Sequence, residues 1–326
     1  MAPGMWTRPG STCLMAKTLG RQVSSLHFFG ETMTQTQRSV RSRKLHASAS
    51  LSASARGRLT AVAAACALAA LAAPAHAAHY VVHNEAELAA AITAASTDGD
   101  PSATIALAND ITVIDPYAMP IATKPIAFVQ GGFTLSAFGD TVYYANTGIT
   151  LSFDGTVQGP TTQLKIGVGT VVLTGTGSNF VNGIEVQEGQ LRVQDGGQIT
   201  FGNAANGGLR VNGDDTHVAV TGSGSFMDAR DGGVDVGSAA GSSLTVADGG
   251  QFRTAGSASF ATAAGTQATV TVTGPGALLT SAGSPMTVGQ DGTASLTVAN
   301  GGQVVIDGGA GTLNLGTNAT GSGTLT

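Results

Sequence analysis

The sequence predicts an all-β fold, a parallel β-solenoid, because its last third repeats itself. The segment LTVADGGQ from Leu244 returns as LTVANGGQ from Leu296, and VTGSGSF from Val220 returns as VTGPGAL from Val272, both at the same interval. Each unit divides again, since Val270 aligns with Leu296 at half that interval. A short strand and a glycine-rich corner that recur at this half interval have the size of one solenoid coil.

Composition favours the same fold class. Glycine accounts for 47 of 326 residues, and charged residues make up only 11%, whereas a globular domain usually carries about 25%. Thr, Val and Leu alternate with small or polar residues, so every second side chain would enter a narrow core. The pairs Gly249-Gly250 and Gly301-Gly302 supply the positive φ angles that corners need. Stacked coils would bury one continuous apolar column.

The segment that ends at Ala77 has the features of an export signal. Nine of the 15 Lys and Arg residues precede the apolar block LTAVAAACALAALAAPAHA, which ends in Ala75-His76-Ala77. This order predicts a signal peptide with an extended basic leader over residues 1–77, cleaved after Ala77. The apolar run is shorter than the ~18 residues of a membrane span. Lipidation at Cys66 is less well supported, and Met33 is an alternative start.

Cleavage would leave an acidic chain. The leader holds nine of 15 basic and one of 20 acidic residues, which leaves 6 and 19 and a net charge of −13. Such a charge argues against nucleic acid and anionic membranes as partners. Both cysteines, Cys13 and Cys66, lie in the leader. The mature protein is therefore expected to owe its stability to coil stacking rather than to disulfides.

The segment HYVVHNEAELAAAITAAS after the cleavage site predicts a strand and then one helix, from Asn84 to Ala95. Asn84 is a favoured N-cap residue, and Glu87 stands where a capping box needs an acid. Four apolar residues share one helical face: Leu88, Ala91, Ile92 and Ala95. We expect this helix to cover the open end of the solenoid. Residues 78–160 would form the cap and irregular first coils, and residues 161–326 the repeats, giving about ten coils in all.

Two stretches resemble a known family. YVVHNEAELAAAI followed by ATIALANDITV is similar to the N-terminal cap and first coil of bacterial autotransporter passenger domains and other pectin-lyase-like proteins. The units VGSAAGSSLTVADGGQ from Val236 and VGQDGTASLTVANGGQ from Val288 resemble repeats of type V secreted and PEP-CTERM-associated surface proteins. The resemblance implies a right-handed parallel β-helix with a short N-terminal capping helix. It also implies a truncated passenger, because the membrane β-barrel of an autotransporter would have to follow Thr326.

The strongest candidate for a chemical site lies where the repeats differ. Four polar residues are replaced by uncharged ones in the next copy of the repeat, so the solenoid does not require them: Asp228, Arg230, Asp231 and Asp235. Carboxylates of this kind can bind Ca²⁺ or act as an acid and base pair on a glycan. A solvated turn is the commoner role of such a cluster. We therefore expect no metal, no cofactor and no catalytic residue, with Asp228, Asp231 and Asp235 as the residues that would hold a metal if one were bound.

Other polar residues give weaker signals. Asp214-Asp215 aligns with Thr266-Gln267 and predicts a turn. His79, His83 and His217 are expected to be surface histidines. Asn318 begins a formal glycosylation sequon, which we discount because the signal and the repeats are typical of bacteria.

These features together predict an exported protein of the bacterial cell surface, outer membrane or extracellular space. The expected function is a non-enzymatic adhesin or structural stalk. Its partners would be host or environmental glycans or proteins, or a further copy of itself, with the outer membrane reached only through a barrel beyond Thr326. The alternatives are a pectin-lyase-like carbohydrate-active enzyme and a structural surface or matrix protein.

Overall fold

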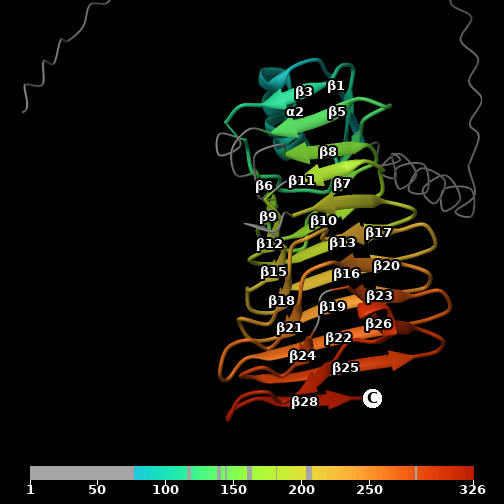
Figure 1. Ribbon diagram of the computed structural model, residues 1–326. Coiled ribbons are helices and arrows are strands. Elements are labelled where there is room, and N and C mark those ends of the chain that lie inside the picture. The colour runs from blue at the N-terminus through green and yellow to red at the C-terminus, as the bar shows by residue number, and fades with distance from the viewer. Residues whose placement is uncertain are drawn as a thin grey trace, which may run out of the picture. The chain divides into compact units, whose positions relative to one another are not determined.

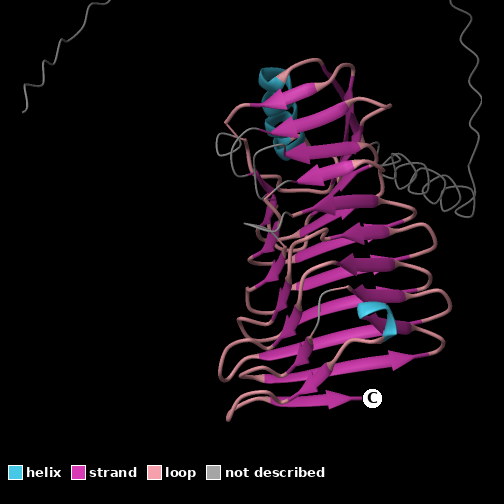
Figure 2. Ribbon diagram, viewed as in Figure 1, coloured by secondary structure: helices cyan, strands magenta, loops and turns pink. Residues whose placement is uncertain are grey.

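Parallel strands stack into a β-solenoid of about nine turns, as the sequence predicts (Figures 1 and 2). The computed structural model describes residues 77–326 except 116–118, 138–140, 144, 160–163, 181, 203–207 and 283–284. The sequence predicted about ten coils, and the structure has about nine turns. The predicted leader, except Ala77, lies outside the described residues. The first strand begins at Ala78, directly after the predicted cleavage site.

Three parallel sheets, which we call A, B and C, form the sides of the solenoid and contain 11, 9 and 8 strands. Sheet A contains β1 (Ala78–Val82), β2 (Ala103–Leu107), β4 (Ile126–Val129), β7 (Thr150–Phe153), β10 (Thr170–Leu173), β13 (Gln190–Gln194), β16 (His217–Thr221), β19 (Ser242–Ala247), β22 (Gln267–Thr273), β25 (Thr293–Ala299) and β28 (Ser322–Leu325).

Sheet B contains β3 (Ile111–Val113), β5 (Thr134–Ala137), β8 (Thr156–Gly159), β11 (Ser178–Phe180), β14 (Gln198–Phe201), β17 (Phe226–Asp228), β20 (Gln251–Thr254), β23 (Leu278–Ser281) and β26 (Gln303–Ile306). Sheet C contains β6 (Thr141–Tyr143), β9 (Leu164–Ile166), β12 (Ile184–Val186), β15 (Leu209–Val211), β18 (Val234–Val236), β21 (Ala258–Phe260), β24 (Met286–Val288) and β27 (Leu313–Leu315). A 3₁₀ turn, η2, spans Asp307–Gly309.

The coil length predicted from the repeats is confirmed in the later coils but does not hold throughout. Val218 pairs with Leu244, Leu244 with Val270 and Val270 with Leu296. The two residues of each pair are 26 positions apart, as are His217 and Ser243. Two earlier coils are shorter, since Thr150 pairs with Thr170 and Thr170 with Gln190. The two residues of each pair are 20 positions apart, as are Thr156 and Thr176. The strands remain paired in register across this change, so the difference in coil length arises at the corners between the strands.

Alternation along the strands places apolar side chains in one continuous core. Val270 and Val272 of β22 are 0% exposed, while the residues between and beside them face outward. Phe180 and Phe201, also 0% exposed, pair across β11 and β14. Nearer the N-terminus the rings of Phe128 and Phe153 stack with their centroids 4.5 Å apart. The core is therefore continuous because the apolar side chains of each coil pack on those of the next coil.

The predicted capping helix is confirmed as α2 (Glu85–Thr97) at the N-terminal end of the solenoid (Figure 1). Oδ1 of Asn84 accepts a hydrogen bond from the backbone N–H of Glu87 at 3.0 Å. The buried face of α2 is the predicted one: Leu88, Ala91, Ile92 and Ala95.

Lys124 fixes the other end of α2. Its ammonium group pairs with the carboxylate of Asp98 and donates to the carbonyl of Asp100 at 2.8 Å. The hydrogen bonds from Lys124 and from the Tyr80 hydroxyl hold the pKa of Asp98 below its usual value. The second coil is thereby tied to the cap. No helix among the described residues is long and apolar enough to cross a membrane.

Candidate functional site

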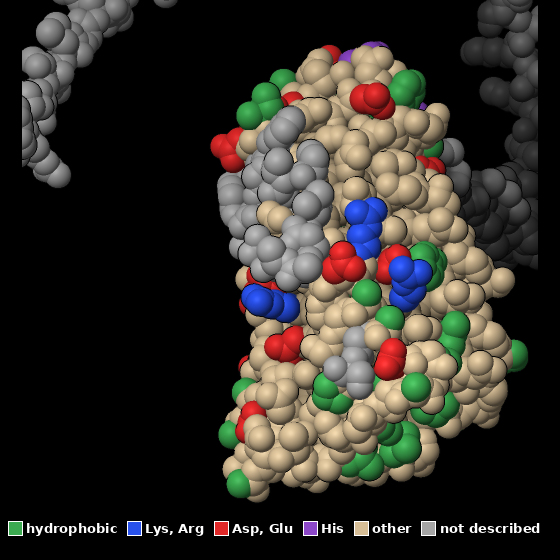
Figure 3. Space-filling model, viewed as in Figure 1, with side chains coloured by type: hydrophobic (Ala, Val, Ile, Leu, Met, Phe, Trp, Pro, Cys, Tyr) green, Lys and Arg blue, Asp and Glu red, His purple; other side chains and the backbone are tan. Residues whose placement is uncertain are grey.

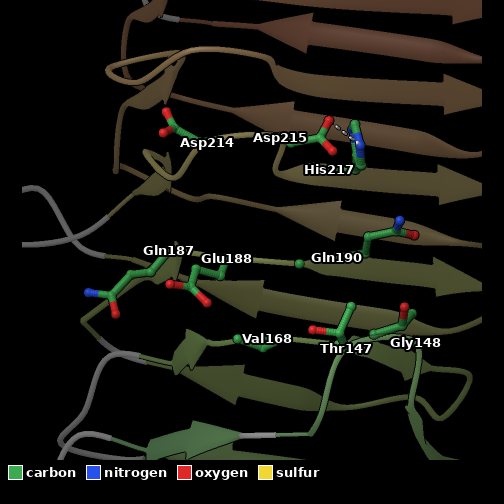
Figure 4. Close-up of a pocket in the computed structure, with 12 residues that line it drawn as sticks. Thr147, Gly148, Val168, Gln187, Glu188, Gln190, Asp214, Asp215 and His217 are labelled. Atoms are coloured by element: carbon green, nitrogen blue, oxygen red, sulfur yellow. Dashed lines mark ion pairs between the residues drawn. The ribbon is translucent and has the colours of Figure 1, made fainter.

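A notch in the side of the solenoid arises where the two short coils lie between longer ones. The corner between β9 and β10 consists only of Gly167, Val168 and Gly169, and the corner between β12 and β13 is equally short. The next corner, from Asn212 to Thr216, has five residues and projects further. The resulting cavity, which we call the notch, has a volume of about 500 Å³ (Figure 4).

Glycine forms the floor of the notch because the coils touch there. A Cβ on Gly189 would lie 2.2 Å from the carbonyl oxygen of Gly169, and Gly189 has a positive φ of 67°. Gly169 is equally confined, since its Cβ would lie 2.9 Å from Cβ of Ala145. A side chain is therefore excluded at Gly169 and at Gly189. This is the local reason why a hollow exists at these two corners.

The rim is polar and comes from successive coils. Figure 4 shows Thr147 at one corner, Val168 at the next, Gln187, Glu188 and Gln190 at the third, and Asp214, Asp215 and His217 at the fourth. Asp214 and Asp215 lie in the predicted turn. The N–H of Ala240 donates to Oδ1 of Asp214 at 3.1 Å, and the N–H of Asp215 donates to the carbonyl of Ala240 at 3.0 Å. These bonds fix the projecting corner to the coil that follows it.

A second hollow of about 310 Å³ continues from the notch over the outer face of sheet A. The two cavities share Gln190 and His217. Ala219 pairs with Arg192 on one side and with Thr245 on the other, so a small side chain stands between two longer ones. Nη2 of Arg192 donates to Oε1 of Gln190 at 2.8 Å. The combined surface is elongated and carries amide, hydroxyl, carboxylate and guanidinium groups.

A serine, a histidine and an aspartate lie in line across this surface. Nδ1 of His217 is 2.7 Å from Oγ of Ser243, and Nε2 of His217 is 3.4 Å from Oδ1 of Asp215. The sequence prediction treated His217 as an isolated surface histidine and missed this contact. The register of β16 and β19, which pairs His217 with Ser243, brings the two together.

This line of residues lacks two features that acyl transfer needs. The side chain of Asp215 is 92% exposed, so water competes for the carboxylate that would have to orient the imidazole. The N–H of Ser243 already donates to the carbonyl of Thr216 at 2.8 Å and does not serve as an oxyanion donor. The arrangement therefore suits hydrogen bonding to a ligand better than covalent catalysis.

The predicted cluster of Asp228, Asp231 and Asp235 is divided between two sheets. Asp228 ends β17 in sheet B, where Oδ1 accepts from the N–H of Arg230 at 2.9 Å and lies 3.6 Å from Nε of Arg253. Asp231 is exposed in the following turn. Asp235 lies in β18 of sheet C. Three carboxylates that are close in sequence thus face different sides, because the chain turns a corner between them.

Asp235 belongs to a row of alternating charges on sheet C. Its neighbour in register is Arg210, and the neighbour of Arg210 on the far side is Glu185. Opposite charges on neighbouring strands stabilise a sheet modestly. Burial nevertheless raises the pKa of Asp235, against the hydrogen bond from Thr262 and the attraction of Arg210. The ionised carboxylate is therefore less favourable in the folded protein than in the unfolded chain.

Replacing Asp235 by Asn is expected to stabilise the protein at neutral pH. A raised pKa means that the folded state holds the proton more tightly, so stability falls as pH rises through the usual range of aspartate, near 4. Thermal melts of Asp235→Asn should show a gain of no more than a few degrees at pH 7 and none at about pH 3. Asp231→Asn, which changes an exposed residue, serves as the control. A loss of stability at pH 7 would show that the Arg210 pair outweighs burial.

The remaining sequence candidates lie on the surface. His79 and His83 are both exposed, and Nδ1 of His83 lies 3.0 Å from Oε2 of Glu87. Asn318 is exposed and donates to Asp291. Within the described part of the chain, no group of three or more His, Cys, Asp or Glu residues is placed to hold a metal ion.

Fold and notch together define the class of this protein, a parallel β-solenoid with a helical N-terminal cap. Comparison of the chain with family models, curated proteins and solved structures found no match.

Proposed function

We propose that the chain is a non-enzymatic, exported passenger of the autotransporter type that acts as an adhesin or stalk at the bacterial cell surface or outside the cell. The leader before Ala77 and the repeat units from Val236 and Val288 support export and this class of protein. The solenoid offers a long, regular side for repeated weak contacts.

The notch with its adjoining hollow is the observation that carries the proposal. Its lining offers amides from Gln187 and Gln190, hydroxyls from Thr147 and Thr170, and the His217 imidazole. Donors and acceptors of this kind match the hydroxyl groups of an oligosaccharide. The surface is open and elongated, as contact with a chain of sugar rings requires. We therefore assign glycans as the ligand class.

Rows of hydroxyl groups extend this surface toward the C-terminus. Ser243 pairs with Thr269 and Thr269 with Ser295, while Thr245 pairs with Thr271 and Thr271 with Thr297. Ser243 and Thr245 also line the hollow beside the notch. The visible face of the solenoid likewise carries few charged side chains on its later coils (Figure 3). Uncharged hydroxyl rows suit weak, additive contact with a polymer.

Binding of the purified chain to an oligosaccharide array tests the proposal. The double variant Gln190→Ala with His217→Ala removes the two side chains shared by the notch and the hollow. We expect it to lose about tenfold or more in affinity for every bound glycan, since each lost hydrogen bond contributes about 1 kcal/mol. Thr280→Ala, on sheet B, is the matched control and should bind normally.

Three results would contradict this proposal. The absence of glycan binding would favour a purely structural surface or matrix protein. Equal glycan binding by the double variant and the unmodified chain would show that the notch is not the glycan site. Turnover of an ester or glycoside that disappears in Ser243→Ala would make the line through His217 and Asp215 catalytic and favour the enzyme alternative.

A further inference from the structure

Charge is distributed unevenly along the notch and its hollow. Glu188 lies at one corner, and Asp214 and Asp215 lie at the next, so three carboxylates line the notch. The residues that line the notch include no Lys or Arg. Arg192 is the one Lys or Arg among the residues that line the adjoining hollow. The notch is therefore anionic, and the positive charge lies in the adjoining hollow, over sheet A.

The surface is closed to a peptide that would bind by strand addition. Such a peptide needs the free edge of a sheet, whereas β13 pairs with β10 and β16, and β16 pairs with β13 and β19. The backbone groups at this level of sheet A already belong to its ladder. Only side chains and glycine corners face the ligand. Recognition through side chains favours a saccharide over an extended peptide.

We propose that the notch selects an amine-bearing oligosaccharide, whose ammonium group is attracted by the carboxylates of Glu188 and Asp215 at the notch and whose neutral rings lie over the hollow toward Arg192. This inference rests on the proposed function and adds the chemical class of the glycan and the orientation in which it binds along the notch and the hollow. Attraction between carboxylates and an ammonium group favours one orientation, and Arg192 repels the amine from the opposite end. The rings then meet Gln190, His217 and Ser243.

A comparison of three probes tests this assignment. The purified chain is titrated by calorimetry, at low and high salt, with an N-acetylglucosamine tetramer, with the same tetramer deacetylated at one terminal ring only (which we call the glucosamine tetramer), and with tetralysine. We expect the glucosamine tetramer to bind about three to ten times more tightly than the acetylated one at low salt, as for exposed charge pairs. Added salt should reduce this preference.

The variant Glu188→Gln with Asp215→Asn removes two charges and keeps the shape. Asn tolerates the left-handed backbone of Asp215, whose φ is 53°. This variant should bind both tetramers equally, because it lacks the two carboxylates that would attract the ammonium group. The matched control is Asp231→Asn with Asp248→Asn, which removes two exposed carboxylates outside the notch, one of them also left-handed with φ 52°. The control should keep the full preference.

Each outcome decides a different point. Equal binding of both tetramers by the unmodified chain overturns the amine selectivity and leaves glycan binding intact. Binding of neither tetramer, together with an empty glycan array, contradicts the proposed function itself. Tetralysine that binds as tightly as the glucosamine tetramer overturns the choice of a saccharide over a basic peptide. Loss of the preference in the control variant shows that net charge, and not the notch, selects the ligand.

Discussion

Gly213→Ala is expected to destabilise the solenoid by about 3 kcal/mol or more, which would lower the melting temperature by roughly 6–12 °C. A Cβ at this position would lie 1.5 Å from the carbonyl oxygen of Gln187 and 2.7 Å from Cγ2 of Thr216. The strand ladders hold neighbouring coils about 4.8 Å apart, so the corner cannot move away without breaking pairs between β13 and β16. Circular dichroism followed during heating measures the effect.

Gly99→Ala is the matched control for this substitution. Nothing lies within 4 Å of the position of its Cβ, and its φ is not in the left-handed range. The same change there should be neutral or slightly stabilising, because alanine restricts the unfolded chain. Equal melting temperatures for Gly213→Ala and the unmodified protein would mean that the corners are not packed as described.

Phe201→Ala is expected to lower the free energy of unfolding by about 3–5 kcal/mol. The side chain is 0% exposed and pairs in register with Phe180 of the coil before it. Its removal leaves a cavity inside a narrow column whose walls are fixed by three sheets. Since each coil contacts only its neighbours, the defect is also expected to weaken the coupling between the two halves. Urea unfolding should then show a lower midpoint and a broader or divided transition.

Phe133→Ala controls for the loss of a ring as such. Phe133 is 37% exposed, so its truncation should lower the free energy of unfolding by about 1 kcal/mol or less. A cost for Phe201→Ala no larger than that of Phe133→Ala would indicate that the column is not a continuous packed core. The same unfolding curves measure both variants.

Local signals allowed several elements to be predicted from sequence. Helix α2 follows from Asn84 as N-cap and from the apolar spacing, and its buried face agrees residue for residue. The later coils follow from the exact repeat, because Leu244 and Leu296 occupy equivalent places in β19 and β25. The buried role of alternate residues follows from the two-residue period of a strand.

The notch could not be predicted in this way. Its cause is the shorter length of the coils from Thr150 to Gln190, a region in which the sequence does not repeat clearly enough to reveal where each coil begins. A search for the spacing between Gly169 and Gly189 would have given a signal, because both glycines line the same floor. Sequence distance also misled the search for a cluster. Asp228 and Asp235 are close in the chain but lie in different sheets.

A parallel solenoid with a helical cap is predictable from the amino-acid sequence, because strand period, corner glycines and capping residues act over a few neighbouring positions. Which polar residues meet depends on how the coils stack. His217 and Ser243 lie on successive coils and are joined by strand register. Asp214 and Glu188 share the notch because one corner projects over a shorter one. Contacts between coils depend on the summed length of every strand and corner between them, and that sum becomes visible only when the coils are stacked.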